Sequence, residues 1–547
     1  MVNIGLKENL VIEFKSDVKC LSDNDIIDSV VAFANTDGGE LYLGVEDNGD
    51  ITGLHAKHHD ATQLAAFIAN KTVPPIAVRI EPLEQEFPYL RISVPKMTCI
   101  VASSTGKIQR RRLKADGTPE NVPMYPYEIA TRLSSLNLLD YSAQAVPDSE
   151  YSDLDPVERE RLRNLIRSYR GETSLLELND EELDKALRLV TTSGDKLIPT
   201  FCGLLLIGKR SALQKHMPTA ESSIQILNGT EVKVNESFLL PALSAFEKIN
   251  DIFTAWNSSE EMDMGLYRLT IPDYDTKAFR EALVNAFCHR DYSVLGRVLI
   301  QLTDTGMTIS NPGGFVEGIN ADNLIDADPH GRNPVLADAM KRIGLAERTG
   351  RGIDRIYEGS LFYGRQLPDY SQSNASLVKL FIAKGPTDKE FIRMLSNEQK
   401  KGTNFPIYSL LILNALRNTP KLTVQQLTDE LKMPESRLRV SLEMMVSSGI
   451  VEAGGNGRGR YYMLGSRYYK KSLTTAEYIR HKNIDPIRHA ELVMELVKTK
   501  GDVCRADVVE LLHITPSQAY RLLARLAKQE KIQMIGSGAG SKYILKK

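Results

Sequence analysis

The sequence predicts a multidomain α+β protein, on three observations. The chain has 547 residues, too many for one hydrophobic core and enough for about three to five domains. Between residues 200 and 386, strand-like runs alternate with helical ones, as in helices packed on a sheet. The C-terminal third repeats one order of helices twice. We therefore expect an α+β body followed by two copies of a small helical domain.

The composition is that of a folded protein in a reducing compartment. Charged residues make up 25% and hydrophobic residues 42% of the chain, ordinary values for a globular protein. The N-terminus lacks the layout of a secretory signal, and no apolar run reaches the roughly 20 residues that cross a bilayer. The five cysteines never form a C-x-x-C pair, which argues against structural zinc. We expect a cytoplasmic protein with no membrane partner.

Charge is distributed unevenly along the chain. Residues 401–547 contain 24 Lys and Arg against 13 Asp and Glu, whereas the preceding residues contain 44 against 57. A basic tail on an acidic body is typical of proteins whose tail contacts a polyanion. Scattered solvating lysines would give the same count, so the fold of the tail has to decide.

The N-terminal segment predicts a helix that leads into a strand. Residues 23–36 read as a helix, and a Gly-Gly pair follows them. Residues 40–47 read as a strand that ends at an Asn-Gly turn. This order resembles the Schlafen AlbA-like domain, over residues 1–135. The resemblance implies contact with DNA or RNA, and some eukaryotic members are metal-dependent RNases.

Three acids of this segment match the nuclease acids of that family. The resemblance places them on Glu8, Glu13 and Asp47, with Lys15 completing the same motif. Carboxylates from separate strands can gather a divalent cation, Mg²⁺ or Mn²⁺, that polarises a phosphate and its attacking water. The alternative is structural, with Glu13 and Lys15 forming a surface ion pair and Asp47 opening a turn.

Two further clusters of the N-terminal segment bear on ligands. The run "KIQRRRLK" predicts a basic strand for nucleic acid, through Arg110, Arg111 and Arg112. The run "HAKHHD" contains His55, His58 and His59. Their spacing places no carboxylate partner on a helical face with them, so we expect a loop cluster rather than a metal site.

Residues 203–209, "GLLLIGK", come close to the phosphate-loop pattern but fail it. Arg210 replaces the hydroxyl residue that would bind magnesium. The residues between the two glycines are all Leu or Ile, which predicts a buried strand rather than a loop of free N–H groups. We therefore reject a helicase interpretation built on this motif.

A polar stripe interrupts the helix predicted at residues 279–293. Glu281, Asn285 and His289 are four residues apart, so they share one face of that helix. A solvated face would explain the stripe, but Asn is a poor mid-helix residue. The sequence "EALVNA" resembles the N-box of the GHKL superfamily. The resemblance implies that Asn285 holds the Mg²⁺ of bound ATP and that Glu281 activates the attacking water.

Later motifs continue this resemblance in the superfamily's order. In "SNPGGF", Asn311 takes the adenine-reading position and Gly313 the glycine after it. "RNP" follows, and then "TGRGI", in which Gly350 and Gly352 precede a helix and would accept phosphate on backbone N–H groups. Asn311 replaces the usual Asp, so we expect ATP binding rather than turnover.

The basic tail resembles two winged helix-turn-helix domains. Each copy predicts three helices and a Gly-rich hairpin. The third helix of each copy would enter the major groove, with Ser436, Arg437 and Arg439 in the first and Gln518, Tyr520 and Arg521 in the second. The wings would contact phosphates through Arg458, Arg460 and Lys542. Plain dimerisation modules share this pattern, but two copies and the basic balance favour nucleic acid.

The predicted architecture is an AlbA-like domain (1–135), a helical linker (136–199), a GHKL-like α/β sandwich (200–386) and tandem winged helices (404–466 and 487–547). The whole resembles the prokaryotic AlbA-type transcriptional regulators, sometimes mislabelled as RecG-like helicases. We therefore expect an ATP-responsive DNA-binding regulator that forms a homo-oligomer. The alternative is a metal-dependent endonuclease of a defence system, acting on RNA or DNA and gated by the GHKL-like domain.

Overall fold

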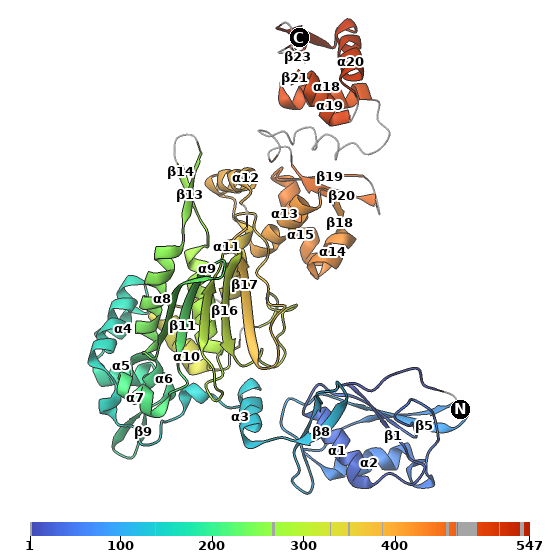
Figure 1. Cartoon of the computed structure of the whole chain (residues 1–547), viewed down its shortest axis with the longest axis vertical. Coiled ribbons are helices and arrows are strands. Elements are labelled where there is room, and N and C mark those ends of the chain that lie inside the picture. The colour runs from blue at the N-terminus through green and yellow to red at the C-terminus, as the bar shows by residue number, and fades with distance from the viewer. Residues whose placement is uncertain are drawn as a thin grey trace.

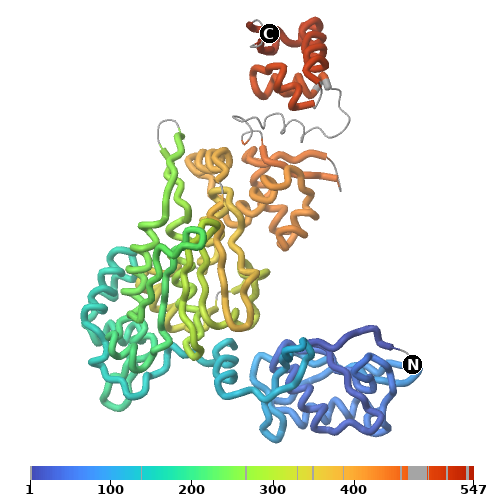
Figure 2. The backbone as a smooth tube through the Cα atoms, viewed as in Figure 1, coloured from blue at the N-terminus to red at the C-terminus, as the bar shows by residue number. Residues whose placement is uncertain are grey.

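The computed structural model describes most of the chain (Figures 1 and 2). The described residues are 3–136, 138–264, 268–328, 330–347, 350–385, 387–455, 459–465, 468, 489–512, 515–536 and 541–546. An N-terminal domain and a central domain are followed by two small units, which we call the first repeat (404–465) and the second repeat (489–546). Within these residues, no helix combines the length and the apolar character that a membrane span requires.

The N-terminal domain is a mixed sheet with helices against it. Its strands follow the order β1-β2-β5-β4, in which β1 and β2 are parallel and the other pairs antiparallel. These strands are β1 (Ile12–Lys15), β2 (Gly39–Leu43), β4 (Arg79–Glu84) and β5 (Pro88–Val94). The remaining elements are α1 (Asp23–Ala34), α2 (Ala61–Lys71), β3 (Thr72–Val73), β6 (Ala102–Ser103), β7 (Gln109–Leu113), β8 (Pro119–Pro123) and α3 (Pro126–Ser135).

The helix and strand predicted for residues 23–47 are both present. Ser22 caps α1 by accepting from the backbone N–H of Asp25, and buried Ile, Val and Phe side chains hold the helix on the sheet. Gly39 joins the two elements where no other residue fits, because a Cβ there would lie 2.5 Å from the Phe33 ring. The strand is shorter than predicted, ending at Leu43, since Gly44 turns the chain with a φ of 91°.

The region predicted as a helical linker, residues 136–199, packs into the central domain. Side chains from Val146 onward share one continuous core with the central sheet. The elements of this region are α4 (Pro156–Ser168), α5 (Asp180–Ala186), β9 (Val190–Ser193) and β10 (Lys196–Pro199). The central domain continues with α6 (Phe201–Ile207) and α7 (Arg210–His216).

The buried strand predicted at residues 203–209 is wrong, because this run lies largely in helix α6. Thr200 caps the helix by accepting from the N–H of Gly203. Gly203 allows a close approach, since a Cβ there would lie 2.0 Å from the carbonyl oxygen of Leu189. Every residue of α6 is buried, and an all-apolar buried helix has no periodicity that separates it from a buried strand.

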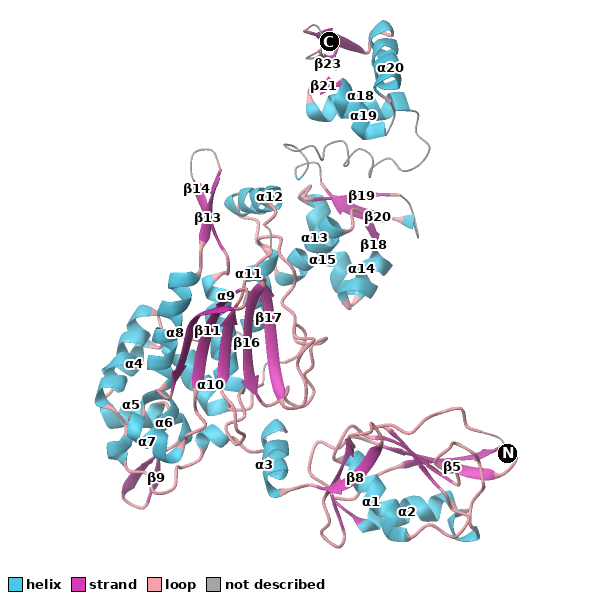
Figure 3. Cartoon of the chain, in the orientation of Figure 1, coloured by secondary structure: helices cyan, strands magenta, loops and turns pink. Residues whose placement is uncertain are grey.

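The central sheet confirms the strands predicted between residues 222 and 386. Its order is β12-β11-β15-β16-β17, with β11 and β15 parallel and the other pairs antiparallel. The strands are β11 (Ser222–Asn228), β12 (Glu231–Phe238), β15 (Val298–Leu302), β16 (Gly306–Pro312) and β17 (Leu377–Ala383). The helices that pack on it or on one another are α8 (Ala242–Trp256), α9 (Thr276–His289), α10 (Pro334–Ile343) and α11 (Gly352–Leu361) (Figure 3).

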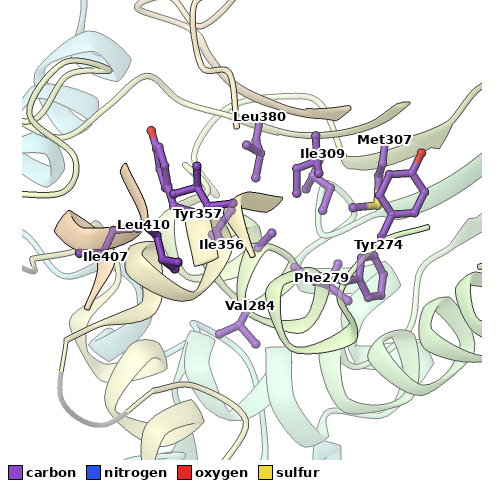
Figure 4. Close-up of a cluster of buried hydrophobic side chains, with 14 of the residues drawn as sticks. Tyr274, Phe279, Val284, Met307, Ile309, Ile356, Tyr357, Leu380, Ile407 and Leu410 are labelled. Atoms are coloured by element: carbon purple, nitrogen blue, oxygen red, sulfur yellow. The ribbon is translucent and has the colours of Figure 1, made fainter. Parts of the chain in front are cut away.

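The core of the central domain continues into the first repeat. Figure 4 shows Phe279 and Val284 of α9, Ile309 of β16 and Ile356 of α11 in one apolar cluster with Leu410 of the first repeat. The hairpin of β13 (Ser259–Asp263) and β14 (Arg268–Pro272) packs on α12 (Lys389–Lys400) in a smaller cluster. The first repeat is therefore joined to the central domain by apolar contacts as well as by the chain.

The two repeats share one order of elements, as predicted. The first contains α13 (Ile407–Asn418), β18 (Leu422–Thr423), α14 (Val424–Leu431), α15 (Glu435–Ser447), β19 (Val451–Gly454) and β20 (Tyr461–Leu464). The second contains α18 (His489–Lys500), β21 (Val503–Cys504), α19 (Arg505–Leu512), α20 (Pro516–Lys528), β22 (Ile532–Ile535) and β23 (Lys542–Leu545). Their sheets have matching orders, β18-β20-β19 and β21-β23-β22.

The histidine run of the N-terminal domain forms a structural loop, with His58 at its centre. The His58 side chain is 3% exposed, and its Nδ1 lies 2.9 Å from Oδ1 of Asp17, which is fully buried. Asp17 also accepts the backbone N–H groups of Leu21 and His55. This carboxylate therefore ties two loops together, which agrees with the predicted loop cluster.

We predict that His58→Leu destabilises the N-terminal domain by about 2–4 kcal/mol, because it leaves a buried carboxylate without one of its partners. Urea unfolding of the full chain measures the loss, and hydrogen exchange of α2 assigns it to this domain. His59→Leu is the matched control, since His59 is exposed and should stay within about 0.5 kcal/mol. Equal effects of the two changes would contradict a structural role for the Asp17–His58 pair.

Candidate nucleotide site and nucleic-acid surfaces

The polar stripe of α9 faces a cavity of about 200 Å³ in the central domain. Asp275 caps the helix by accepting the N–H groups of Lys277 and Ala278. The apolar side chains of α9 then pack toward the core, which leaves the stripe beside β16, α10 and the first turn of α11. Solvation does not explain the stripe. The predicted residues that line the cavity are Glu281, Asn285, His289, Asn311, Gly350 and Gly352.

Glu281 is the most constrained residue of the stripe. Its side chain is buried, and it accepts the backbone N–H of Glu347. Oε1 lies against the start of α11, where a Cβ on Gly352 would come within 2.1 Å of it. Burial raises the pKa of Glu281, with nearby Arg355 opposing the rise. The carboxylate therefore occupies the helix N-terminus at which an anion would bind.

His289 is neutral at physiological pH. Burial, with the charge of Arg332 adding to it, lowers the pKa of His289 to about 4. The ring borders Gly331, where a Cβ would lie 3.1 Å from Cε1. The stripe thus presents a carboxylate, an amide and an uncharged imidazole to the cavity. These groups can accept from or donate to a polar ligand without carrying a positive charge.

At the end of β16, Asn311 lies at the cavity, and Gly313 follows two residues later. Asn311 is buried and donates from Nδ2 to the carbonyl oxygen of Pro312 at 3.3 Å. Gly313 has a φ of 91°, and a Cβ there would lie 2.8 Å from Cβ of Asp291. Its N–H donates to the carbonyl of Ser376. The structure therefore gives Gly313 a role in chain geometry, and it does not line the cavity.

The "RNP" motif fixes the frame around the cavity. Arg332 and Asn333 are both buried. Arg332 donates to the carbonyl of Gly314 at 3.1 Å and pairs with Asp291 at 3.4 Å. Asn333 donates from Nδ2 to the carbonyls of Cys288 and Arg290 at 2.9 and 2.8 Å, which satisfies the C-terminal end of α9. These residues position the site without lining it.

A segment that sequence reasoning missed covers the cavity. Residues 315–328, which we call the lid segment, contain no described helix or strand. The inner side chains that line the cavity are Phe315, Val316, Ile319, Leu324 and Ile325. Glu317, at the start of the segment, pairs with Lys96 at 2.8 Å and with Arg132 at 2.6 Å. The sequence of this segment shows four acids, Glu317, Asp322, Asp326 and Asp328, but no periodicity that would predict its position.

The N-terminal acids lie near one another, but Glu13 already has cationic partners. Glu13 is 5% exposed and pairs with Arg111 at 2.6 Å and with Lys15 at 2.9 Å. Asn121 donates to it at 3.1 Å. The expected ion pair with Lys15 is present, but the expectation of a surface pair is wrong for Glu13, because the Arg111 guanidinium covers it while lying 4.5 Å from the Phe33 ring centroid.

Glu8 and Asp47 are the other two acids of this group, and the three carboxylates, all within the described residues, do not form a metal-binding arrangement. Glu8 accepts the N–H of Phe14 at 2.8 Å. Burial raises the pKa of Glu8, and the charges of Asp47 and Glu13 add to the rise. Asp47 is exposed in the turn that ends at Gly49, as the structural alternative expected. In the residues that the structure describes, no three His, Cys, Asp or Glu side chains are arranged to hold a metal ion.

The predicted nucleic-acid residues are mostly held by acids of the chain. Arg111 is buried against Glu13 and does not reach the surface. Arg110 pairs with Glu128 in a half-buried contact. The exposed pairs are Arg112 with Glu120, Arg439 with Glu435, Arg460 with Glu443, and Lys542 with Asp502. Such exposed pairs contribute little, about 0–1 kcal/mol, and can exchange for phosphate. Arg458 lies outside the described residues.

Two helix starts in the repeats have specific contacts. Gln518, predicted to read bases, forms a capping box with Thr515, accepting its N–H at 2.9 Å. Arg521 donates to the carbonyl of Ser517, and Tyr520 is 55% exposed beside it. Ser436 is exposed on the first turn of α15, and Arg437 reaches the lid segment. The second repeat therefore leaves its helix start more open than the first.

Four family profiles match the chain in order. Residues 8–116 match "Schlafen, AlbA_2", and residues 133–223 match a domain of unknown function, DUF8451. Residues 296–381 match "Putative ATP-dependent DNA helicase recG C-terminal", and residues 410–453 match "Bacterial regulatory protein, arsR family". The chain combines an AlbA_2 domain, a recG C-terminal-type domain and an arsR-type segment. The predicted architecture is confirmed at this level, although α9 with its polar stripe precedes the residues of the third profile.

Comparison with solved structures finds a chain of similar length. The crystal structure of the DIP2311 protein from Corynebacterium diphtheriae aligns with 98% of this chain and 95% of its own, at 18% identity and a TM-score of 0.49. No curated protein matches the sequence.

We predict that Glu281→Gln raises the melting temperature at pH 8. A carboxyl whose pKa is raised by folding contributes to stability while it is protonated. This contribution to the free energy of unfolding is complete below the ordinary pKa of the carboxyl and is lost as the pH rises through the raised pKa. The amide carries no such charge, so the gain should shrink as the pH falls toward 4. Glu177→Gln, on an exposed carboxylate, controls for net charge. A gain that is the same at both pH values would contradict the burial effect.

Proposed function

We propose that the protein is an ATP-responsive DNA-binding regulator. The observation that carries this proposal is the α9 stripe, which brings Glu281 and Asn285 to one cavity at the first turn of α11. A carboxylate and an amide four residues apart suit a nucleotide with its divalent cation. The match to the recG C-terminal profile and the resemblance to the GHKL superfamily support the same class of ligand.

The chain's own residues would divide the work as follows. Asn285 would supply an oxygen ligand to Mg²⁺, whose role when bound is to neutralise phosphate charge. The N–H groups around Gly350 and Gly352 would receive the phosphates, so the Glu281 carboxylate has to leave its place at α11. In the ligand-free site, burial raises the pKa of Glu281, and the displaced carboxylate would act as the general base. Asn311, at the end of β16, would contact the base.

The DNA-binding half of the proposal rests on the two repeats. Each has three helices and a small sheet, as a winged helix-turn-helix does, and the arsR-type match, residues 410–453, lies within the first repeat. Among the described residues, Arg439, Arg460 and Lys542 are exposed and pair with acids at the surface, where such pairs can exchange for phosphate. The nuclease alternative gains no support here, because a cation at Glu13 would have to displace Arg111 and Lys15 together.

We predict that ATP with Mg²⁺ raises the melting temperature of the full chain, since a ligand of the folded state stabilises it by mass action. Asn285→Ala should abolish the rise, whereas Glu281→Ala should keep or enlarge it, because it empties the phosphate position, and should lose any hydrolysis. Thermal melts and phosphate release measure the two effects. Asn164→Ala, on the exposed face of α4, is the matched control. An unchanged ATP response in Asn285→Ala would show that the metal ligand lies elsewhere.

We predict that duplex DNA binding weakens steeply with salt, because basic residues displace counterions from phosphate. Lys542→Ala should reduce the slope of log affinity against log salt by about one at most, the value for a lost contact between phosphate and an unpaired cation, because Lys542 is paired with Asp502. Fluorescence anisotropy of the full chain with a labelled duplex measures both. Lys185→Ala, on exposed α5, should leave the slope unchanged. Affinity that is flat with salt, or tighter binding of single-stranded RNA, would contradict a DNA regulator.

A further inference from the structure

Two acids on the outer side of the lid segment form ion pairs with the first repeat. Oδ1 of Asp322 lies 2.6 Å from Nζ of Lys432, and Oδ1 of Asp326 lies 2.5 Å from Nη1 of Arg437. Tyr408, on α13, donates to the same oxygen of Asp326 at 2.7 Å. Two carboxylates of the central domain thus meet two cations of the first repeat.

Those cations stand where a helix-turn-helix meets DNA. Lys432 ends α14, in the turn between the two helices, with a φ of 51°. Arg437 lies in the first turn of α15, the helix that follows. In helix-turn-helix proteins the N-terminal residues of the second helix contact base edges in the major groove. Asp322 and Asp326 therefore occupy the positions that phosphate oxygens and base acceptors would take.

The inner side of the same segment limits the size of the cavity. Ile319, Leu324 and Ile325 line it, and its volume is about 200 Å³. Pockets for small-molecule ligands have volumes of about 300–1,000 Å³. Entry of a nucleotide requires the lining to move, and the longest stretch of that lining outside the described helices and strands is the lid segment. Outward movement of Leu324 and Ile325 displaces Asp322 and Asp326, their neighbours in sequence.

We propose that the lid segment is an internal competitor of DNA, masking the first repeat until a nucleotide displaces it. The nucleotide part of this proposal rests on the proposed function, whereas the masking rests on the ion pairs alone. Both pairs are exposed, with the four side chains between 38% and 71% accessible. Exposed pairs are weak, so the mask lowers the affinity for DNA without abolishing it.

The second repeat provides an internal contrast. Its α20 occupies the place of α15 in the shared order of elements. Among the described residues, no ion pair joins α20 to the central domain, and Arg521 contacts only its own helix. Removal of Arg521 should therefore weaken DNA binding by the same factor with and without nucleotide. Removal of Arg437 should weaken it more when the lid segment has been displaced.

The test is the affinity of the full chain for a labelled random-sequence duplex, with and without a non-hydrolysable ATP analogue and Mg²⁺. Asp322→Asn with Asp326→Asn should tighten binding about two- to tenfold without nucleotide, the range that two exposed ion pairs can supply. The analogue should tighten wild-type binding toward that value and add little to the lid variant. Glu236→Gln on β12 with Asp251→Asn on α8, which removes two exposed charges outside the lid segment and the first repeat, should match the wild type within about twofold.

The outcomes separate the two proposals. A lid variant that binds DNA no tighter than the charge control overturns the masking. An analogue that raises the melting temperature but leaves wild-type DNA affinity unchanged overturns the release by nucleotide. An analogue that fails to raise the melting temperature overturns the proposed function instead, and the lid variant alone then decides the masking. Where coupling is present, DNA must tighten binding of the analogue by the same factor, because linkage is reciprocal.

Discussion

The central domain depends on a buried carboxylate at the start of a helix. Glu281 reaches across from α9 to the first turn of α11, and Gly352 leaves room for it. Burial of such a charge is costly unless donors and positive ends of dipoles surround it. The N–H of Glu347 and the cation of Arg355 meet that need in part, since burial still raises the pKa of Glu281. In the ligand-free fold this carboxylate lies at the helix start where the phosphates of a nucleotide would bind.

The lid segment connects this arrangement to both ends of the chain. Its first acid, Glu317, is held by Lys96 and Arg132 of the N-terminal domain. Its later acids are held by the first repeat. One stretch of 14 residues without regular structure thus touches the cavity, the N-terminal domain and a helix-turn-helix. A change of ligand at the cavity can therefore reach the N-terminal domain and the first repeat through the existing contacts of the lid segment.

Local patterns in the sequence predicted most of the helices and strands but fewer of the contacts between side chains. The central strands, α1 and the duplicated helices follow from periodicity and turn residues, which act over short separations. Glu13 and Arg111 lie 98 residues apart, and nothing local reveals that they meet. The apolar run of α6 is equally compatible with a buried strand and a buried helix, because it has no polar positions to show a periodicity. Gln518 matched a base-reading position and a capping box, and the local hydrogen bond is the one that forms.

The exposed pairs at the lid segment also decide how many counterions DNA binding releases. A cation that is paired with Asp322 or Asp326 is already neutralised within the protein. When the cation binds a phosphate instead, its carboxylate partner becomes hydrated. Ions condensed on the DNA are released as before, but ions are then taken up around the freed acids. The net release per contact is smaller for Lys432 and Arg437 than for a free cation. An internal mimic of DNA therefore makes the whole chain less sensitive to ionic strength than its count of basic residues implies.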